Sequence, residues 1–368
     1  MQIEKFLISR DPVWYHAWPD IALTHSGKLV CVFNECTHHC GRPHSRIMLC
    51  ESVDRGRTWA PKHPLTESTD NLTYYYNCPR ISVLEDNRIV IAVDRIPAEG
   101  ESTGIGKSGN FLYVSEDDGQ TWQEPVQVPL YGIVPSKLTV LDNGRWLLAA
   151  HRFFNDSLSE YLIYSDDRGK TWSREILLAH DLRYQLCEVS LLPLGNGVVA
   201  ALLRENSGQG LDCLKALSYD NGETWSELKA LPLPGCHRPV AGQLNDGRFF
   251  ITYRFHQGGA GGMGCSSQNL FSAITDRASL LSSSRKEAHM RIIPLDYDGA
   301  AKADTGYSGW IQFADGEIYV VNYIVDDHRD RGQIRGYSLR LACGERGTCC
   351  DVCPTPEVGI VKCGILPE

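Results

Sequence analysis

Apolar residues along the chain come in pairs of short runs, and a polar turn separates the two runs of each pair. Most of these turns carry an Asp-Gly, Asn-Gly or Asp-Asn step, which is typical of β-hairpins. Six such hairpins follow one another: 21–33, 81–93, 138–150, 189–203, 240–253 and 308–323. Their turn residues recur every 50 to 69 positions, at Gly27, Asn87, Gly144, Gly197, Gly247 and Gly316. This spacing predicts six repeats of one β-rich unit.

A second repeat lies between the hairpins. The pattern S-x-D-x-G-x-T-W, called the Asp box below, occurs four times, at 52–59, 115–122, 165–172 and 218–225. We expect a fifth, decayed copy to begin at Ser272, where the glycine and the tryptophan are absent. The Asp side chain can accept hydrogen bonds from amides of its own turn, and Gly supplies positive φ. The boxes therefore indicate structural turns between strands and no catalytic groups.

Each unit supplies four strands: two in the hairpin, a third that runs into the Asp box, and an outer fourth. Six units of four antiparallel strands predict an all-β fold, a six-bladed β-propeller, over residues 1–342. The last unit has no Asp box, so we expect residues 334–341 to form its third strand. Residues 3–10 would then add the outer strand and close the ring. Residues 343–368 are rich in Cys, Gly and Pro, lack the repeat, and are expected to form an irregular tail.

Composition narrows the possible partners. The net charge of −9 argues against a nucleic-acid backbone or an anionic membrane, although a local arginine cluster can still bind a small anion. No stretch of about 18 apolar residues is present to span a membrane.

The amino terminus has no secretory signal, so we expect a cytoplasmic protein whose 14 cysteines are reduced, with a disulfide framework as the alternative. The oligomeric state is not determined by the sequence.

Two segments invite interpretation as metal sites. Cys349, Cys350 and Cys353 lack a spaced second pair of ligands, and the adjacent His38 and His39 cannot easily share one ion. We therefore expect no metal and no cofactor. A histidine of this loop could instead act as a general acid or base, because its ordinary pKa is close to neutral. Solvated loop histidines are the alternative interpretation.

Charged and polar residues recur where the strands of each unit meet one mouth of the ring. They lie at the starts of the first strands (16–20, 77–80, 135–137, 187–188, 236–239 and 305–308) and at the ends of the second strands (34–35, 94–95, 151–152, 204–206, 253–254 and 322–323). Charged strand ends are common wherever strands meet water. Their recurrence in all six units nevertheless predicts a functional mouth.

The Asp boxes and hairpins resemble those of the sialidase (neuraminidase) superfamily, also called BNR-repeat proteins, over most of the chain. The resemblance implies a mouth that binds an anionic sugar through three arginines, with a tyrosine nucleophile, an assisting glutamate and an aspartate as acid/base. Gly306-Tyr307-Ser308 is similar to the Tyr-Ser segment before the family's last hairpin. Cys187-Glu188-Val189 is similar to the segment that carries the glutamate and the second arginine. These matches imply Tyr307 as nucleophile, Glu188 as its base and Arg204 as a carboxylate ligand.

The chain departs from the family pattern at three points. Ala17-Trp18-Pro19-Asp20 replaces Phe-Arg-Ile-Pro, so the first arginine is missing. The loop 35–46, where the acid/base is expected, contains no aspartate, and no arginine directly precedes the fifth box. We therefore expect the acid/base among residues of the first unit: Asp20, Glu35, His38 and His39. We expect the ligands of the substrate among the cations of the mouth: Arg80, Arg95, Lys137, Arg152, Arg204, Arg238 and Arg254.

Three functions are compatible with such a mouth. The leading hypothesis is an exo-acting, sialidase-like glycoside hydrolase whose substrate is an acidic sugar, sialic acid or a related one. The alternatives are a polysaccharide lyase acting on uronate-containing glycans and a non-catalytic glycan-binding propeller. A lyase forms an unsaturated product that absorbs in the ultraviolet, a hydrolase releases a reducing sugar, and a binding protein does neither. Fold alone does not choose among them.

Overall fold

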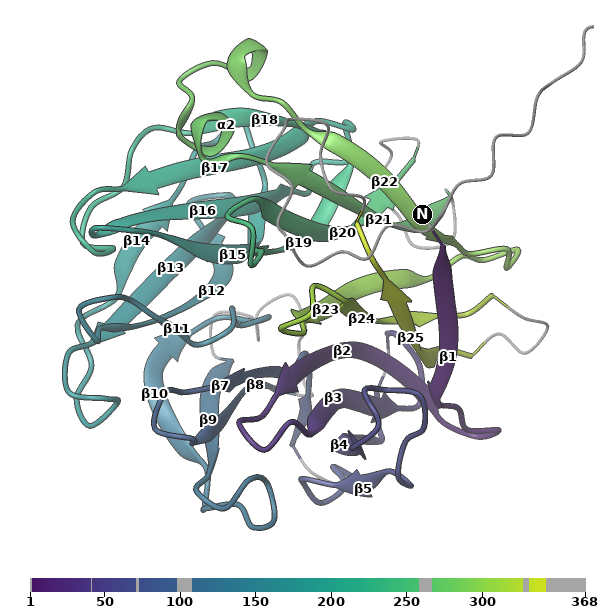
Figure 1. Cartoon of the computed structure of the whole chain (residues 1–368). Coiled ribbons are helices and arrows are strands. Elements are labelled where there is room, and N and C mark those ends of the chain that lie inside the picture. Colours follow the sequence, from purple (N-terminus) through teal and green to yellow (C-terminus); the bar gives the residue numbers. More distant parts are fainter. Residues whose placement is uncertain are drawn as a thin grey trace, which may run out of the picture.

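The computed structural model describes residues 2–40, 42–70, 73–97, 108–257, 267–326 and 331–341. Six antiparallel sheets, one for each repeat, surround a central axis (Figure 1). They are numbered blades 1 to 6 in chain order. The structure confirms an all-β, six-bladed β-propeller with four-stranded antiparallel blades. The predicted tail, residues 343–368, lies outside the described residues.

From the axis outward, the strands of blades 1 to 3 are β2 (Tyr15–Leu23), β3 (Leu29–Cys36), β4 (Ser45–Ser52) and β5 (His63–Pro64); β6 (Tyr74–Tyr76) with β7 (Arg80–Val83), β8 (Ile89–Pro97), β9 (Gly109–Ser115) and β10 (Val126–Tyr131); and β11 (Thr139–Val140), β12 (Trp146–Phe154), β13 (Ser157–Ser165) and β14 (Ile176–Ala179). In blade 2 the first strand is split, and β6 and β7 both pair with β8.

The strands of blades 4 to 6, in the same order, are β15 (Leu186–Gly195), β16 (Val198–Glu205), β17 (Asp212–Ser218) and β18 (Lys229–Pro234); β19 (Cys236–Gln243), β20 (Phe249–His256), β21 (Gln268–Thr275) and β22 (Arg291–Tyr297); and β23 (Thr305–Gln312), β24 (Ile318–Ile324), β25 (Gln333–Leu339) and β1 (Ile3–Ser9). The amino-terminal strand β1 pairs with β25 and lies at the outer edge of blade 6 (Figure 1). The predicted closure of the ring is therefore confirmed.

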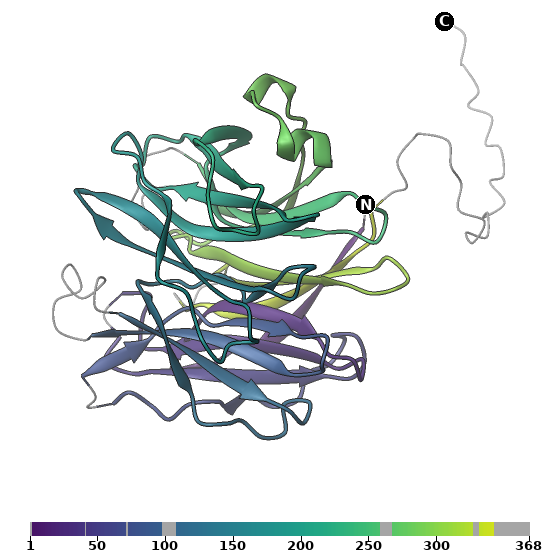
Figure 2. The ribbon, with the colours of Figure 1, turned by 90° about the vertical axis from the view of Figure 1, so that its left-hand side faces the viewer.

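The core lies between the blades. The side view in Figure 2 shows neighbouring sheets stacked against each other. Every residue of β3 and of β24 is buried, because both faces of an inner strand are covered by the adjacent blades. This explains why the second strands read as continuous apolar runs in the sequence.

The Asp boxes close the third strands on the same side of the ring as the hairpin turns. In blade 4, Asp220 accepts hydrogen bonds from the amide of Thr224 (2.9 Å) and from Ser218 Oγ (2.7 Å). Between neighbouring blades, Lys28 of a hairpin turn donates to the carbonyl of Asp118 in the next box (2.6 Å). The opposite side, where first strands start and second strands end, is called the mouth side.

The fifth box differs from the expectation. Thr275 pairs with Phe249 just as Ser165 pairs with Trp146, so the box position begins at Thr275 and the prediction of Ser272 is wrong. Ser272 lies inside β21. After Thr275, Asp276 caps a short helix, α2 (Arg277–Leu281), by accepting from the Ser279 amide (2.7 Å). A 3₁₀ turn, η2 (Arg285–Glu287), follows. Within the described ranges, no helix has the length and apolarity needed to cross a membrane.

We expect Asp220→Ala to lower the melting temperature by a few degrees without changing ligand binding at the mouth. The substitution removes the acceptor that holds the Thr224 amide and the Ser218 hydroxyl, and a lost turn hydrogen bond costs about 1 kcal/mol. Thermal unfolding followed by circular dichroism measures the shift. An unchanged melting temperature would show that this box does not stabilise blade 4.

Candidate active site

The first strands of blades 1, 4, 5 and 6 contain a β-bulge at the same height. In each, two residues oppose one residue of the second strand. The first residue of each bulge has φ between +50° and +56° although it is not glycine: Trp18, Glu188, Arg238 and Tyr307. Such backbone costs roughly 1–3 kcal/mol and tends to occur at functional sites. A bulge also redirects side chains, and these bulges bring Glu188, Arg238 and Tyr307 together.

Tyr307, Glu188 and Arg204 form one hydrogen-bonded group. The Tyr307 hydroxyl donates to Glu188 Oε1. Arg204 Nη1 donates to the same carboxylate oxygen (2.7 Å) and lies 3.3 Å from Tyr307 Oη. Tyr307 is 7% exposed and Glu188 4% exposed. The structure thus joins the three residues that the family resemblance implies, and their catalytic roles stay predictions.

The protonation states of this group follow from burial and charge. Burial raises the pKa of Tyr307 well above its usual value, and the Glu188 carboxylate raises it further. Burial would also raise the pKa of Glu188, but the nearby charges of Arg204 and Arg238 outweigh it and lower that pKa to about 2. At neutral pH the pair is therefore a neutral phenol that donates to a carboxylate.

Four arginines gather at this group. The guanidinium carbon of Arg254 lies 4.9 Å from the centre of the Tyr307 ring, and that of Arg238 lies 6.0 Å from it. Arg80 lies near Arg238. Burial and the like charge of Arg238 together lower the pKa of Arg80 to about 10. Several buried guanidinium nitrogens have no hydrogen-bond partner in the part of the chain that the structure describes: Arg80 Nε and Nη2, Arg204 Nε, and Arg238 Nε and Nη1.

The charge balance favours an anionic ligand. Glu188 is the carboxylate in contact with Arg204, while Arg254 lies 3.6 Å from Asp304. Arg238 donates to a backbone carbonyl, that of Pro135 (3.0 Å), and forms no ion pair among the described residues. A carboxylate can accept paired hydrogen bonds from guanidinium groups, so the unpaired donors suit that chemistry.

Asp304 links this group to the first blade. It accepts hydrogen bonds from Tyr323 Oη (2.7 Å) and from the Tyr15 hydroxyl, and Arg254 Nη2 donates to Tyr323 Oη (2.7 Å). His39 Nδ1 lies 2.6 Å from Asp304 Oδ2, the oxygen that also accepts from Tyr15, whereas Tyr323 binds Oδ1. Burial would raise the Asp304 pKa, but His39 and Arg254 lower it to about 2. Because Asp304 is ionised, Nδ1 of His39 is the protonated nitrogen.

The four acid/base candidates, Asp20, Glu35, His38 and His39, differ in burial and in the groups that they contact. His39 is 22% exposed at its side chain and is oriented by Asp304. His38 is exposed. Glu35 is buried and bonded to His16 (3.0 Å), Arg46 (2.6 Å) and Lys62, which together lower its pKa to about 2 against the effect of burial. Glu35 is thus enclosed in blade 1 and not brought to Tyr307.

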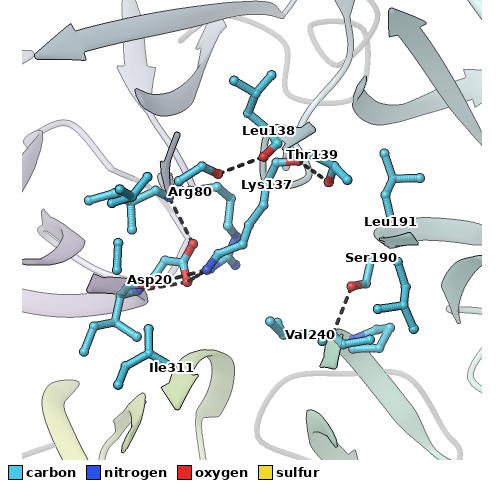
Figure 3. A pocket seen from close by; sticks show the side chains of 18 of the residues that line it. Asp20, Arg80, Lys137, Leu138, Thr139, Ser190, Leu191, Val240 and Ile311 are labelled. Atoms are coloured by element: carbon cyan, nitrogen blue, oxygen red, sulfur yellow. Dashed lines mark hydrogen bonds and ion pairs between the residues drawn. The ribbon is translucent and has the colours of Figure 1, made fainter. Parts of the chain in front are cut away.

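Asp20 lies at the inner end of a cavity in the central channel. The cavity, about 590 Å³, extends along the first strands toward the hairpin turns, where Gln243 is exposed. Figure 3 shows Asp20, Arg80 and Lys137 together on one wall. Lys137 Nζ is 3.1 Å from Asp20 Oδ1, and the Ile81 amide donates to Oδ2 (3.0 Å). Asp20 and Lys137 line this cavity and bridge neighbouring blades. Arg80 and Arg238 line it as well, whereas Tyr307 and Glu188 do not.

Arg95 and Arg152 are not brought to the Tyr307 group. Arg152 forms an ion pair with Glu175 (2.7 Å) and stacks on Tyr161, and Arg95 donates to Tyr113 Oη (3.1 Å) and stacks on Phe111. The physical reason is strand alternation. Each follows by one residue the position that Arg204 occupies in blade 4, so each points to the opposite face. This geometry does not support the prediction that Arg95 and Arg152 bind the substrate.

One group of potential metal ligands is present in the part of the chain that the structure describes: Asp11, His16 and Glu35. The ammonium group of Lys62 lies among them, 2.6 Å from Asp11 Oδ2 and 3.1 Å from His16 Nε2. The ammonium group of Lys62 therefore supplies the positive charge that a metal ion would bring to these three side chains.

Sequence reasoning did not identify Asp304, and it placed His151 at the mouth without choosing it as a site residue. Asp304 directly precedes the segment Thr305-Gly306-Tyr307, and its position before the nucleophile candidate was the available signal. His151 lies at the mouth end of β12 and accepts a hydrogen bond from the Glu188 amide (3.3 Å). In the sequence, His151 lies at the end of a second strand, at the position that Arg204 and Arg254 occupy in their blades.

Two curated sialidases match part of this chain in sequence. A sialidase from Clostridium perfringens is 26% identical over 221 residues, which cover 50% of this chain and 56% of that protein. A sialidase from Paraclostridium sordellii is 25% identical over 178 residues, covering 38% of this chain and 43% of that protein. The chain thus spans about half the length of the curated relatives it matches.

Solved structures share the fold. A Dyadobacter fermentans protein of unknown function has a TM-score of 0.75 and 21% identity, covering 92% of this chain and 99% of that one. The intramolecular trans-sialidase of Ruminococcus gnavus, in complex with oseltamivir carboxylate, has a TM-score of 0.66 and 14% identity, covering 89% and 94%. The model of the BNR repeat-like domain matches residues 83–320, more than half of the chain. The chain therefore belongs to the BNR repeat-like domain family, as a sialidase-like propeller.

Proposed function

We propose that this protein is a sialidase-like glycoside hydrolase that acts on an acidic sugar, sialic acid or a related one. The observation that carries the proposal is the contact of Tyr307 with Glu188 and Arg204 inside a group of buried arginines. A nucleophile beside its base, with unpaired guanidinium donors around both, suits attack on a sugar that carries a carboxylate.

In this mechanism Glu188 accepts the phenolic proton as Tyr307 attacks the anomeric carbon. A phenol is a weak nucleophile until it loses its proton, and burial makes that loss harder. The ionised Glu188 in direct hydrogen-bond contact offsets this cost. Arg204 and Arg254 stabilise the negative charge that develops on the Tyr307 oxygen, because both lie beside the phenol. Arg80 and Arg238 are assigned to the carboxylate of the substrate.

His39 is the acid/base of this proposal. Its Nδ1 donates to the ionised Asp304, so Nε2 is the nitrogen left to exchange a proton with the leaving group. The arrangement takes the place of the family aspartate that the loop 35–46 lacks. His39 is also the one candidate of blade 1 that is both partly exposed and connected, through Tyr323 and Arg254, to the Tyr307 group.

We expect Asp304→Asn to lower kcat by roughly 10²-fold for a substrate with a sugar leaving group. An aryl leaving group such as 4-methylumbelliferone departs with little protonation, so the same variant should lose less than about tenfold with it. Parallel kinetics on the two substrates measure the difference. Asp315→Asn is the matched control, because Asp315 also forms an ion pair with an arginine but lies on the Asp-box side. Equal losses on both substrates would exclude His39 and Asp304 from leaving-group protonation.

The function itself is tested by incubating the protein with a panel of sialosides and uronate-containing glycans under two readouts. Release of a reducing sugar from a sialoside supports the proposal. Growth of ultraviolet absorbance with a uronate glycan would replace it with a lyase. Binding without either product would make the protein a glycan-binding propeller.

A further inference from the structure

In four of the six blades, the side chain at the mouth end of the second strand binds the backbone of the next blade. The equivalent positions, here called the exit ring, are Asn34, Asp94, His151, Arg204, Arg254 and Tyr323. Asn34 donates to the carbonyl of Tyr76 (2.9 Å), Asp94 accepts from the Val134 amide (2.9 Å), and Arg254 donates to the Thr305 carbonyl. His151 belongs to this series, because its Nδ1 accepts from the Glu188 amide at 3.3 Å.

The Glu188 amide needs this partner. In blade 4 the pairing with β16 passes from Cys187 directly to Ser190, so Glu188 has no strand partner of its own. Its φ of +56° is also unfavourable for a residue with a side chain. A buried amide without an acceptor would cost about 1–3 kcal/mol more. His151 supplies the acceptor at the residue whose carboxylate meets Tyr307.

We propose that His151 is a positioning residue: by accepting the Glu188 amide it fixes the bulge in which the Glu188 carboxylate meets Tyr307. The inference rests on the proposed function for its kinetic consequence, though not for its structural one. His151 itself reaches the site through Glu188 and is not assigned a contact with substrate.

The surroundings of His151 keep its imidazole neutral, as an acceptor requires. Burial lowers its pKa to about 4, and of the nearby charges Glu188 raises it while Arg204 and Arg238 lower it. Its strand neighbour Glu160 is fully buried, with no hydrogen-bond partner of good geometry although the Val189 amide lies nearby. Burial raises the pKa of Glu160 well above its usual value, which favours the neutral form of this neighbour of His151.

The test compares His151→Leu, which removes the acceptor, with His151→Asn, whose Oδ1 can take the place of Nδ1. On the sialoside we expect kcat to fall roughly 10²-fold in the Leu variant with little change in KM, because a misplaced base costs about that much. The Asn variant should keep kcat within about threefold of the wild type, because it keeps the acceptor. The wild type should also lose activity as the pH falls toward 4, where His151 protonates, and the Asn variant should not share this acid limb.

Asp94→Leu is the matched control. It removes the equivalent acceptor from the Val134 amide of blade 3. The next residue, Pro135, holds Arg238 through its carbonyl, so any effect of this variant on the site should appear in KM and not in kcat. We expect it to lower the melting temperature about as much as His151→Leu while leaving kcat near the wild-type value. Equal kcat losses in the two Leu variants would reduce His151 to a general stabilising contact and overturn the proposal.

Crystal structures separate this inference from the proposed function. If His151→Leu does not fold, His151→Gln, which moves the acceptor about one bond further out, takes its place. We expect the Glu188 backbone of the variant to leave the left-handed region and its contact with Tyr307 to be lost. If that contact persists unchanged, His151 does not position Glu188, whether or not the wild type cleaves any sugar. If the wild type is inactive but the contact is lost as expected, the proposed function fails and the positioning role stands.

Discussion

Replacing Tyr307 by Phe is expected to lower kcat by at least about 10³-fold on an acidic-sugar substrate, because the nucleophile is removed. Binding should change little. The ring and its packing against Arg254 remain, and Glu188 keeps its ion pair with Arg204. Initial rates give kcat, and calorimetric titration with the substrate gives the affinity of the inactive variant.

Tyr253→Phe is the control for this experiment. Tyr253 is fully buried, and its hydroxyl has no hydrogen-bond partner among the described residues, so its removal should leave both kcat and stability close to wild type. Wild-type turnover by the Tyr307→Phe variant would remove Tyr307 from the nucleophile's role. The mechanism would then have to centre on His39 and Asp304.

Arg238→Met is expected to weaken binding of the acidic sugar by roughly 100-fold while leaving the melting temperature unchanged or higher. The binding loss follows from a missing charge-assisted contact to the substrate carboxylate. The stability gain follows from burial. Arg238 is 2% exposed, two of its nitrogens are unpaired, and the methionine side chain removes a desolvated charge. Glu188 stays ionised at neutral pH, because Arg204 still holds its pKa down.

Calorimetric titration and thermal unfolding, run on the same preparations, measure the two effects. Arg145→Met is the comparison: Arg145 lies on the Asp-box side and pairs with Asp166 (2.7 Å) and Glu223 (2.8 Å). That variant should lose a little stability and no affinity. A strong drop in the melting temperature of Arg238→Met, with affinity unchanged, would mean that Arg238 is a structural cation and binds no substrate carboxylate.

Part of the site could be predicted from the sequence, because two of its segments resemble segments of the sialidase superfamily. The similarity of the segments around Glu188 and Tyr307 implied their pairing, and the structure joins them across 119 positions of the chain. Residue type at the strand ends was a poor guide to the other members. Arg204 and Arg254 point to Tyr307, whereas Arg95 and Arg152 point away, because side chains alternate along a strand and these two lie one residue further on.

The sequence by itself determined the architecture of this protein. Hairpin turns, Asp boxes and apolar runs are local signals, because turn chemistry and strand alternation act over a few residues. They specified six blades and the closure by β1. Only the tertiary structure decided the chemistry of the mouth. Bulges with positive φ shift the alternation where Glu188, Arg238 and Tyr307 converge, and the closed ring brings His39 to Asp304, 265 positions away. Neither effect leaves a local pattern, since each depends on packing between blades.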